Sequence, residues 1–513
     1  MRRCRPRNAA GRACAGALAL AGAALLPLAC HAQRAWQIVP SIGLSETYSD
    51  NVALAAEPAA VNGWITDVTP GLRIQRNGPR LKLFLDSQFH LLRYSSLSSL
   101  GTTQRYLDSA ATFEALEHWL YLDASASITQ QARNAVGPVS NTPSAPSAVS
   151  NRVETRVGQF SPYVKGFFGD AVQYLGRARM AEVQAQNDVI PATRLQDASL
   201  RLGNAAAARR LAWDVEASTL TVKNDQIGSL DDSRARASII AMVLPQFRLS
   251  AIGGYDSTEF AGPGRRSGAS KGVGFAWYPS PRTQALGVYE KRFFGEAHDF
   301  AAQYRTPLTA WRMTSTRDLA VLPSLLAGGG PATSFSLMND LLATSVVDPL
   351  ERADTARQRV DTLGLAGGAP LSSGSLTTNP ILYSRTELSG AYSGPRDTLV
   401  VAFEHRQQRV TGAGLGAPAA ATDNNRQTSQ SVRFVHRLTP LTTLGFSAAS
   451  RRASLLDVPD QTSLQRQYTA DWVTRLGMHA SLSLGVRHVT FDGTSLFRSY
   501  RENAAVAVFT FQL

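Results

Sequence analysis

The chain has 513 residues, a formal net charge of +13 and three cysteines. All three, Cys4, Cys14 and Cys30, lie near the N-terminus, which excludes a disulfide framework and a thiolate metal site for the remainder of the chain. The length suits several soluble domains or one large closed architecture.

The first 32 residues predict a secretory signal peptide. Five arginines precede the apolar run "ALALAGAALLPLA", and small residues follow in "ACHAQ". We expect cleavage after Ala32; cleavage before Cys30, which would make a lipoprotein, is the alternative, although Pro27 stands where such signals normally carry leucine. The run is shorter than the ~20 residues of a spanning helix, which excludes a transmembrane anchor. Export excludes nucleic acid as a partner and directs the basic charge toward outer-membrane lipids and lipopolysaccharide.

After the leader, the chain repeats short segments in which apolar and polar residues alternate. The segments "RLKLFLDSQFHL" (80–91), "WLYLDASASIT" (119–129) and "TLVVAFEHRQ" (398–407) are examples. In the second, Leu120 and Leu122 share one face while Asp123 and Ser125 occupy the other. Period two with one apolar and one polar face predicts strands between two different media. A water-soluble sandwich produces the same alternation, so this pattern alone leaves both architectures open.

The spacing of turn signals favours a membrane barrel. Short Gly- and Pro-containing signals such as "RNGPR" (76–80), "FFGD" (167–170) and "PSPR" (279–282) join strands in pairs. Longer polar connections, such as 132–152 and 411–425, separate the pairs. An alternation of tight turns and long loops is typical of a transmembrane β-barrel with short periplasmic turns and long outer loops.

The C-terminal segment "ENAAVAVFTFQL" (502–513) ends the chain inside a predicted strand, with Phe509, Phe511 and Leu513 on one face. A long apolar edge invites aggregation unless the sheet closes on itself. Bacterial outer-membrane barrels end in such a strand, so we expect the barrel assembly machinery to recognise it. We predict an all-β fold: a transmembrane antiparallel up-and-down β-barrel of about 22 strands (range 18–24) over residues 33–513, in the cell outer membrane. Tryptophans near the predicted strand ends are typical of interfacial belts: Trp36, Trp64, Trp119, Trp213 and Trp277.

One long connection, residues 320–378, departs from the strand pattern. It is Gly-rich at both ends, and "LMNDLLATSVVDPLERADTARQRVDTL" (337–363) between them has helical character. Pro349 suits the first turn of a helix. An apolar stripe follows it, formed by Leu350, Ala353, Ala356, Val360 and Leu363. Long connections are usually functional or disordered. The segment is therefore either a part folded into the lumen, where it narrows the pore, or a surface-exposed outer loop.

No catalytic, cofactor or metal motif is recognisable. The seven histidines after the leader form no H-x-x-x-H pair, and we predict no cofactor and no enzyme activity. The oxygen-rich stretch "ETYSDN" (46–51) has too few regularly spaced ligands for calcium and is interpreted as a strand exit.

The polar face of the predicted strands carries many arginines. The candidate lumen residues are Arg177, Arg179, Arg201, Arg234, Arg236, Arg406, Arg433, Arg437 and Arg487. Guanidinium groups bind carboxylate and phosphate at two points, so one interpretation is a pore for anionic or hydroxyl-rich polymers. The other, which we favour, is cross-strand ion pairing with acids of the same face, which keeps a watery lumen rigid.

Four stretches suggest a family. "IVPSIGLSETYSDNVAL" (38–54), "WITDVTPGLRIQRNGPRLKL" (64–83), "FSPYVKGFFGDA" (160–171) and "GFAWYPSPRTQALGVYEKRFFGEAH" (274–298) resemble the outer-membrane β-barrel family associated with exosortase/PEP-CTERM systems, which is similar to barrel porins. The resemblance implies a role in exopolysaccharide export or envelope biogenesis, as a pore or anchor with extracellular polysaccharide as a partner. The alternatives are an outer-membrane hydrolase and a non-conducting structural scaffold.

Overall fold

The computed structural model describes most of the chain after residue 35. The described residues are 36–139, 151–169, 171–186, 191–204, 210–224, 228–261, 264–321, 334–343, 352, 355–356, 359–360, 377, 379–411, 423–458 and 460–513. The predicted leader and its cleavage site lie outside them.

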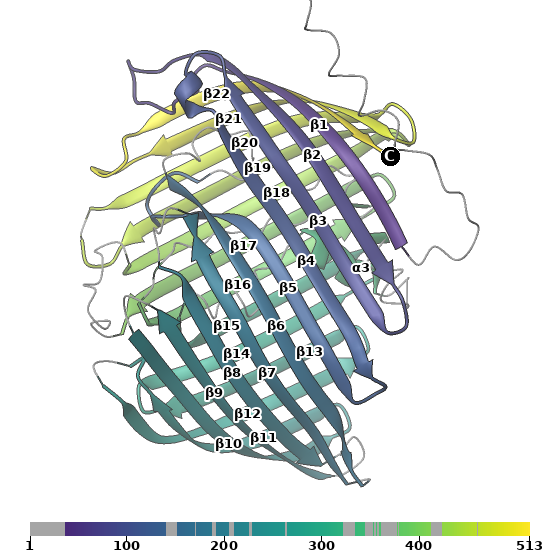
Figure 1. Cartoon of the computed structure of the whole chain (residues 1–513), viewed down its shortest axis with the longest axis vertical. Coiled ribbons are helices and arrows are strands. Elements are labelled where there is room, and N and C mark those ends of the chain that lie inside the picture. The colour runs from purple at the N-terminus through teal and green to yellow at the C-terminus, as the bar shows by residue number, and fades with distance from the viewer. Residues whose placement is uncertain are drawn as a thin grey trace, which may run out of the picture.

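The described chain folds into one closed antiparallel sheet of 22 strands (Figure 1). The strands are β1 (Trp36–Ser49), β2 (Gly63–Asn77), β3 (Leu81–Tyr94), β4 (Thr102–Leu116), β5 (Leu120–Ala132), β6 (Arg152–Phe168), β7 (Val172–Ala185), β8 (Thr193–Asn204), β9 (Leu211–Asn224), β10 (Gly228–Leu244), β11 (Phe247–Thr258), β12 (Arg266–Ser280), β13 (Thr283–Arg292), β14 (Gly295–Arg305), β15 (Thr309–Ala320), β16 (Ile381–Ser393), β17 (Asp397–Val410), β18 (Asn425–Thr439), β19 (Thr442–Leu455), β20 (Thr462–Arg475), β21 (Ala480–Asp492) and β22 (Tyr500–Gln512). A 3₁₀ turn, η1 (Ser98–Leu100), and a helix, α3 (Ser334–Leu342), interrupt the strand pattern. The predicted fold class and strand number are confirmed.

Each strand pairs with its neighbour in sequence, and the first pairs with the last. β1 is paired with β2 along its whole length, from Trp36 with Arg76 to Ser49 with Gly63. On its other edge β1 pairs with β22 only from Ser41 onward, ending with Ser49 opposite Ala504. This pairing removes both free edges, so the sheet is a barrel.

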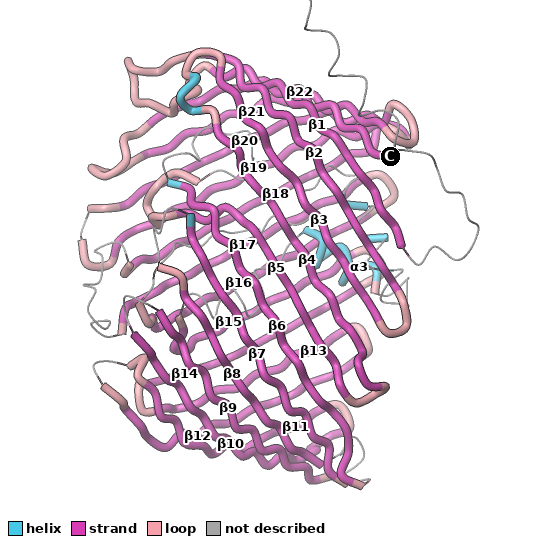
Figure 2. Tube along the Cα trace, viewed as in Figure 1, coloured by secondary structure: helices cyan, strands magenta, loops and turns pink. Residues whose placement is uncertain are grey.

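The two ends of the barrel differ in their connections (Figure 2). β1 begins and β22 finishes at one end, which also carries the short turns, including 78–80, 281–282 and 440–441. The signals "RNGPR" and "PSPR" therefore mark turns as predicted. The opposite end carries the long connections 133–151 and 321–380. In bacterial barrels short turns face the periplasm and long loops face outward, which orients this barrel.

The two faces of the sheet differ in polarity. Side chains such as Leu44, Val273 and Phe446 are large, apolar and exposed, and they lie on the outward face. Tryptophans at the periplasmic ends of strands are also exposed there, including Trp36, Trp119 and Trp277, which fits an interfacial belt. Among the described residues, no helix is both long and apolar enough to cross a membrane.

Candidate functional site

The face opposite to the exposed apolar side chains lines the inside of the barrel. Two contacts between strands that are not neighbours demonstrate this. Arg236 on β10 reaches Glu290 on β13 at 2.6 Å, and Arg234 on β10 reaches Asp318 on β15 at 3.3 Å. Such contacts cross the concave side of a curved sheet, so these charged residues project into the lumen.

Eight of the nine predicted lumen arginines form an ion pair with a carboxylate on the same face. The pairs are Arg177–Asp123 (3.3 Å), Arg179–Asp197 (2.7 Å), Arg201–Asp214 (2.6 Å), Arg234–Asp318 (3.3 Å), Arg236–Glu290 (2.6 Å), Arg406–Glu404 (2.9 Å), Arg433–Asp471 (3.0 Å) and Arg487–Glu502 (2.9 Å). Arg437, near the periplasmic end, donates instead to the carbonyl oxygen of Pro395 at 3.5 Å. The eight guanidinium groups are therefore paired with carboxylates of the barrel wall, in agreement with the ion-pairing interpretation.

A buried charge network lies near the outer end of the lumen and centres on an arginine that the sequence analysis missed. Arg292 donates through Nε to Asp256 Oδ2 at 2.7 Å and through Nη1 to Asp318. Arg292 and Asp256 side chains are fully buried, and Arg234 joins both acids. The alternation in "YEKR" does place Glu290 and Arg292 on one face, but their partners lie on β10, β11 and β15, none of which is adjacent to β13. The network ties β10, β11, β13 and β15 together inside the barrel.

An outer connection crosses to the far wall. Residues 133–139 follow β5, yet they bind β19 and β20, which lie well away from β5 in the strand order. Arg451 donates to the carbonyl oxygens of Ala135 (2.5 Å) and Gly137 (3.2 Å). The side-chain amide of Gln465 accepts a hydrogen bond from the backbone N–H of Val139 and donates one to its carbonyl oxygen. Val136 is fully buried in an apolar cluster with residues of β19. This connection therefore spans part of the outer mouth.

A second outer connection folds against the inner wall on another side of the barrel. Phe260, just after β11, is buried against inner-face residues of β7, β8, β9 and β10, together with Val321. Its carbonyl oxygen accepts a hydrogen bond of 2.5 Å from Thr411 Oγ1, at the start of the connection after β17. The first residues of the connections after β11, β15 and β17 therefore meet at the outer end of the lumen.

Helix α3 lies inside the barrel near its periplasmic end. It belongs to the 321–380 connection, which leaves β15 and enters β16 at their outer ends. Its residues Met338, Leu341 and Leu342 lie on one helical face and are buried against inner-face residues near the periplasmic ends of β15–β18: Ala310, Ala391, Val400 and Val435. Figure 1 shows α3 inside the sheet, toward the side where the C-terminus is marked. An outer connection therefore reaches almost through the barrel.

Two further described residues of this connection, Ala356 and Val360, belong to the same buried cluster. The rest of the predicted apolar stripe, and Pro349, lie outside the described residues.

One ion pair joins α3 to the wall. Arg312, on the inner face of β15, donates to Asp340 Oδ2 at 2.5 Å. Burial raises the pKa of the Asp340 carboxyl above its ordinary value, because loss of water disfavours the carboxylate more than the Arg312 guanidinium favours it. The ionised form of Asp340 is therefore less favourable in the docked helix than it would be in water.

A polar recess of 300 Å³ opens on the inner wall formed by β1, β2, β3 and β22. His90 Nδ1 lies 2.8 Å from Asp67 Oδ2 and 3.1 Å from Thr69 Oγ1. Arg73 pairs with Asp86 at 3.3 Å beside them. The recess offers hydrogen-bond donors and acceptors to a small polar molecule. No group of three or more His, Cys, Asp or Glu residues suited to a metal ion occurs in the described part of the chain.

These features define a class. An even number of antiparallel strands in a closed barrel, an apolar outward band with tryptophans at its border, a polar interior and loops folded inward are those of an outer-membrane β-barrel. The barrel sits among outer-membrane lipids.

Comparisons with known proteins bear on what kind of barrel this is. No family model and no curated protein matches the chain. Similar solved structures include the siderophore receptor PirA from Pseudomonas aeruginosa (8% identity, TM-score 0.42, covering 93% of this chain and 80% of that one) and the ferric-catecholate import receptor Fiu from E. coli K12 (8%, 0.46, 92% and 81%). A third is the FrpB iron transporter from Neisseria meningitidis (10%, 0.47, 92% and 81%).

These comparisons correct the family prediction. The similar structures are named as siderophore receptors and an iron transporter, not as members of the exosortase/PEP-CTERM-associated family, so that prediction was wrong, as was the role in exopolysaccharide export or envelope biogenesis. The physical reason is that the matching stretches, such as 64–83, consist of strand and turn residues that any barrel of this architecture needs. The hydrolase and scaffold alternatives fail with it. The similar proteins are named as receptors and transporters rather than enzymes, in agreement with the prediction of no enzyme activity.

Proposed function

We propose that the protein is an outer-membrane uptake receptor whose lumen is closed at rest by its own connections and opens to admit a small solute. Barrels of 22 strands enclose a lumen wide enough to need a plug. In this chain the outer connections 133–139 and 259–261 fold in from one end, and α3 lies near the other.

The position of α3 carries the proposal. An outer loop with no role in transport gains nothing by burying Met338, Leu341 and Leu342 at the periplasmic end of the lumen. A closure, by contrast, needs a segment that docks firmly but reversibly. Helix α3 contacts the wall through one small apolar face and through one ion pair, between Asp340 and Arg312. Because these contacts are few, the helix can undock from the wall without unfolding the barrel.

The ligand class that we propose is a ferric siderophore, the class named for the similar receptors. The recess on the inner wall has a volume within the range of small-molecule sites. It presents the carboxylates of Asp67 and Asp86, the imidazole of His90 and the guanidinium of Arg73 to a polar chelate. We also propose that β22 is the element recognised by the barrel assembly machinery.

The test is uptake of radioactive iron by a Gram-negative host that lacks its own siderophore receptors. Cells producing this protein should accumulate iron from ferric enterobactin, a catecholate, or from a hydroxamate chelate, and cells with an empty vector should not. The described residues contain no cysteine, so the variant Arg312→Cys/Asp340→Cys can be joined by a short bis-maleimide. Joining α3 to β15 should abolish uptake, while each single-cysteine variant treated in the same way retains it.

The possible failures are distinct. No uptake of any ferric siderophore would refute the ligand class. Uptake that persists after complete cross-linking would refute α3 as the closing element, whatever the ligand is.

A further inference from the structure

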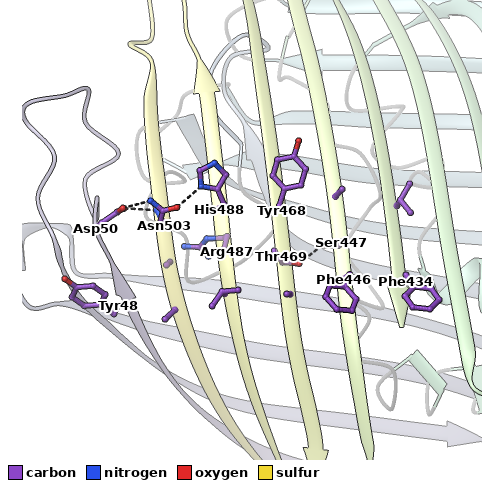
Figure 3. Close-up of a pocket in the computed structure, with 16 residues that line it drawn as sticks. Tyr48, Asp50, Phe434, Phe446, Ser447, Tyr468, Thr469, Arg487, His488 and Asn503 are labelled. Atoms are coloured by element: carbon purple, nitrogen blue, oxygen red, sulfur yellow. Dashed lines mark hydrogen bonds between the residues drawn. The ribbon is translucent and has the colours of Figure 1, made fainter. Parts of the chain in front are cut away.

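A groove of 920 Å³ lies on the outward face over β18–β22 and β1 (Figure 3). Most of its lining is apolar and comes from the membrane-facing positions of these strands. Figure 3 shows Phe434 and Phe446 on one side and Tyr48 on the other. A smaller groove of 480 Å³ continues from it and shares Tyr48, Ala470 and Val486.

The groove exists because small residues alternate with large ones across the sheet. In one lateral row, Ala470 on β20 faces Phe446 on β19 and Val486 on β21. In the same row Ala505 on β22 lies between Val486 and Tyr48. The methyl groups leave furrows between bulky neighbours, and the width of such a furrow suits a hydrocarbon chain.

The outer end of the groove is polar. Asn503 donates to both carboxylate oxygens of Asp50, through its backbone N–H (2.8 Å) and its side chain (2.7 Å). The Asn503 side-chain oxygen lies 2.7 Å from His488 Nδ1, and the His488 ring stacks against Tyr468. These hydrogen bonds occupy Asp50 and leave the imidazole edge at the top of the furrow.

Two arginines stand one step further outward. Arg466 is two residues beyond Tyr468 on β20, and Arg501 is two residues beyond Asn503 on β22. Both pair with Thr490 on the strand between them, so they lie about 10 Å apart at the usual strand spacing. Both are exposed; Arg466 has one acid near it, Asp492 at 3.4 Å, and Arg501 has no acidic partner among the described residues.

We propose that this surface binds lipid A of the outer leaflet, with an acyl chain in the groove and a phosphate between Arg466 and Arg501. The arginines supply paired charge for a phosphate, and Thr490 supplies a hydroxyl between them. The apolar furrow begins below the polar row of Tyr468, His488 and Asn503, so charged, polar and apolar groups follow one another along the wall. This is the order of groups in a lipid with a phosphorylated head and several chains. The site is on the outer wall and is independent of the proposed uptake function.

The test uses the whole purified barrel in a non-ionic detergent and native mass spectrometry to count bound lipid A. Arg466→Gln/Arg501→Gln should lower retention roughly tenfold, as expected for the loss of charge-assisted hydrogen bonds. Ala505→Phe should lower it as well by filling the furrow. The matched control is Lys271→Gln/Lys291→Gln, a directly paired and exposed outward-facing basic couple on β12 and β13. That control should retain lipid A like the unaltered protein.

Three results would overturn the proposal. Equal loss in the lysine control would mean that basic residues around the barrel bind lipid without a defined site. Equal retention of dephosphorylated lipid A would remove the role of the arginines. Equal competition by phosphatidylglycerol would show a general phosphate preference rather than a lipid A site.

Discussion

Loosening α3 should open the lumen. Leu341 and Leu342 are 5% and 2% exposed and bury their side chains against the wall of β15–β18. Truncation of a buried leucine to alanine costs about 2–5 kcal/mol. In Leu341→Ala/Leu342→Ala, even the lower figure for both residues amounts to roughly 4 kcal/mol against docking, or about a thousandfold change in the ratio of docked to free helix.

The variant should therefore show a larger and steadier single-channel conductance in planar bilayers. Cells that produce it should become sensitive to vancomycin, which is too large for narrow pores. Leu484→Ala is the matched control, because Leu484 lies on the outward face and is 46% exposed. Boiling should still change the gel mobility of both variants, which verifies that each barrel has folded. If the folded double variant conducts no better than the Leu484→Ala protein, α3 does not close the lumen.

Three further predictions concern other contacts. Because burial raises the pKa of Asp340, the docked helix binds a proton more tightly than a free one. Docking is then most favourable below about pH 4 and loses this contribution as the pH rises through the raised pKa. Acidification from pH 7 to pH 4 should leave conductance unchanged or lower it, and Asp340→Asn should remove any such response; opening in acid would contradict this. Arg451→Met removes the donors to Ala135 and Gly137, so added protease should cut the 133–139 connection on intact cells faster, at unchanged barrel yield. Phe511→Asp places a charge on the outward face of β22 and should reduce outer-membrane abundance at least severalfold, measured by immunoblot; normal abundance would argue against recognition of this strand.

Much of the barrel follows from local patterns. Period-two alternation and turn residues act over a few positions, so the strands and short turns were predictable from the sequence. The pair Arg179–Asp197 was within reach as well, because these residues are direct partners across neighbouring strands. Of the two acids that Arg234 contacts, Asp256 is likewise its direct partner on the neighbouring strand, whereas Asp318 lies five strands further along and is brought near only by curvature of the closed sheet.

The inward segments were beyond local reasoning for a related reason. Met338 and Leu341 are apolar in either a surface loop or a lumen helix, and only their contacts with Val400 and Val435 distinguish the two. Those contacts join residues that are far apart in the sequence, and no local sequence pattern links them. The family resemblance failed because strand and turn chemistry identifies an architecture and says little about ligands.

The β1–β22 pairing also makes assembly conditional on complete synthesis. Ser49 Oγ donates to Glu502 across 453 residues of chain, so closure is the contact with the greatest entropic cost and the last that the chain can form. A chain interrupted before β22 keeps two unpaired edges, which invite degradation or aggregation. Because β22 closes the sheet against β1, truncation before β22 is expected to prevent closure of the barrel.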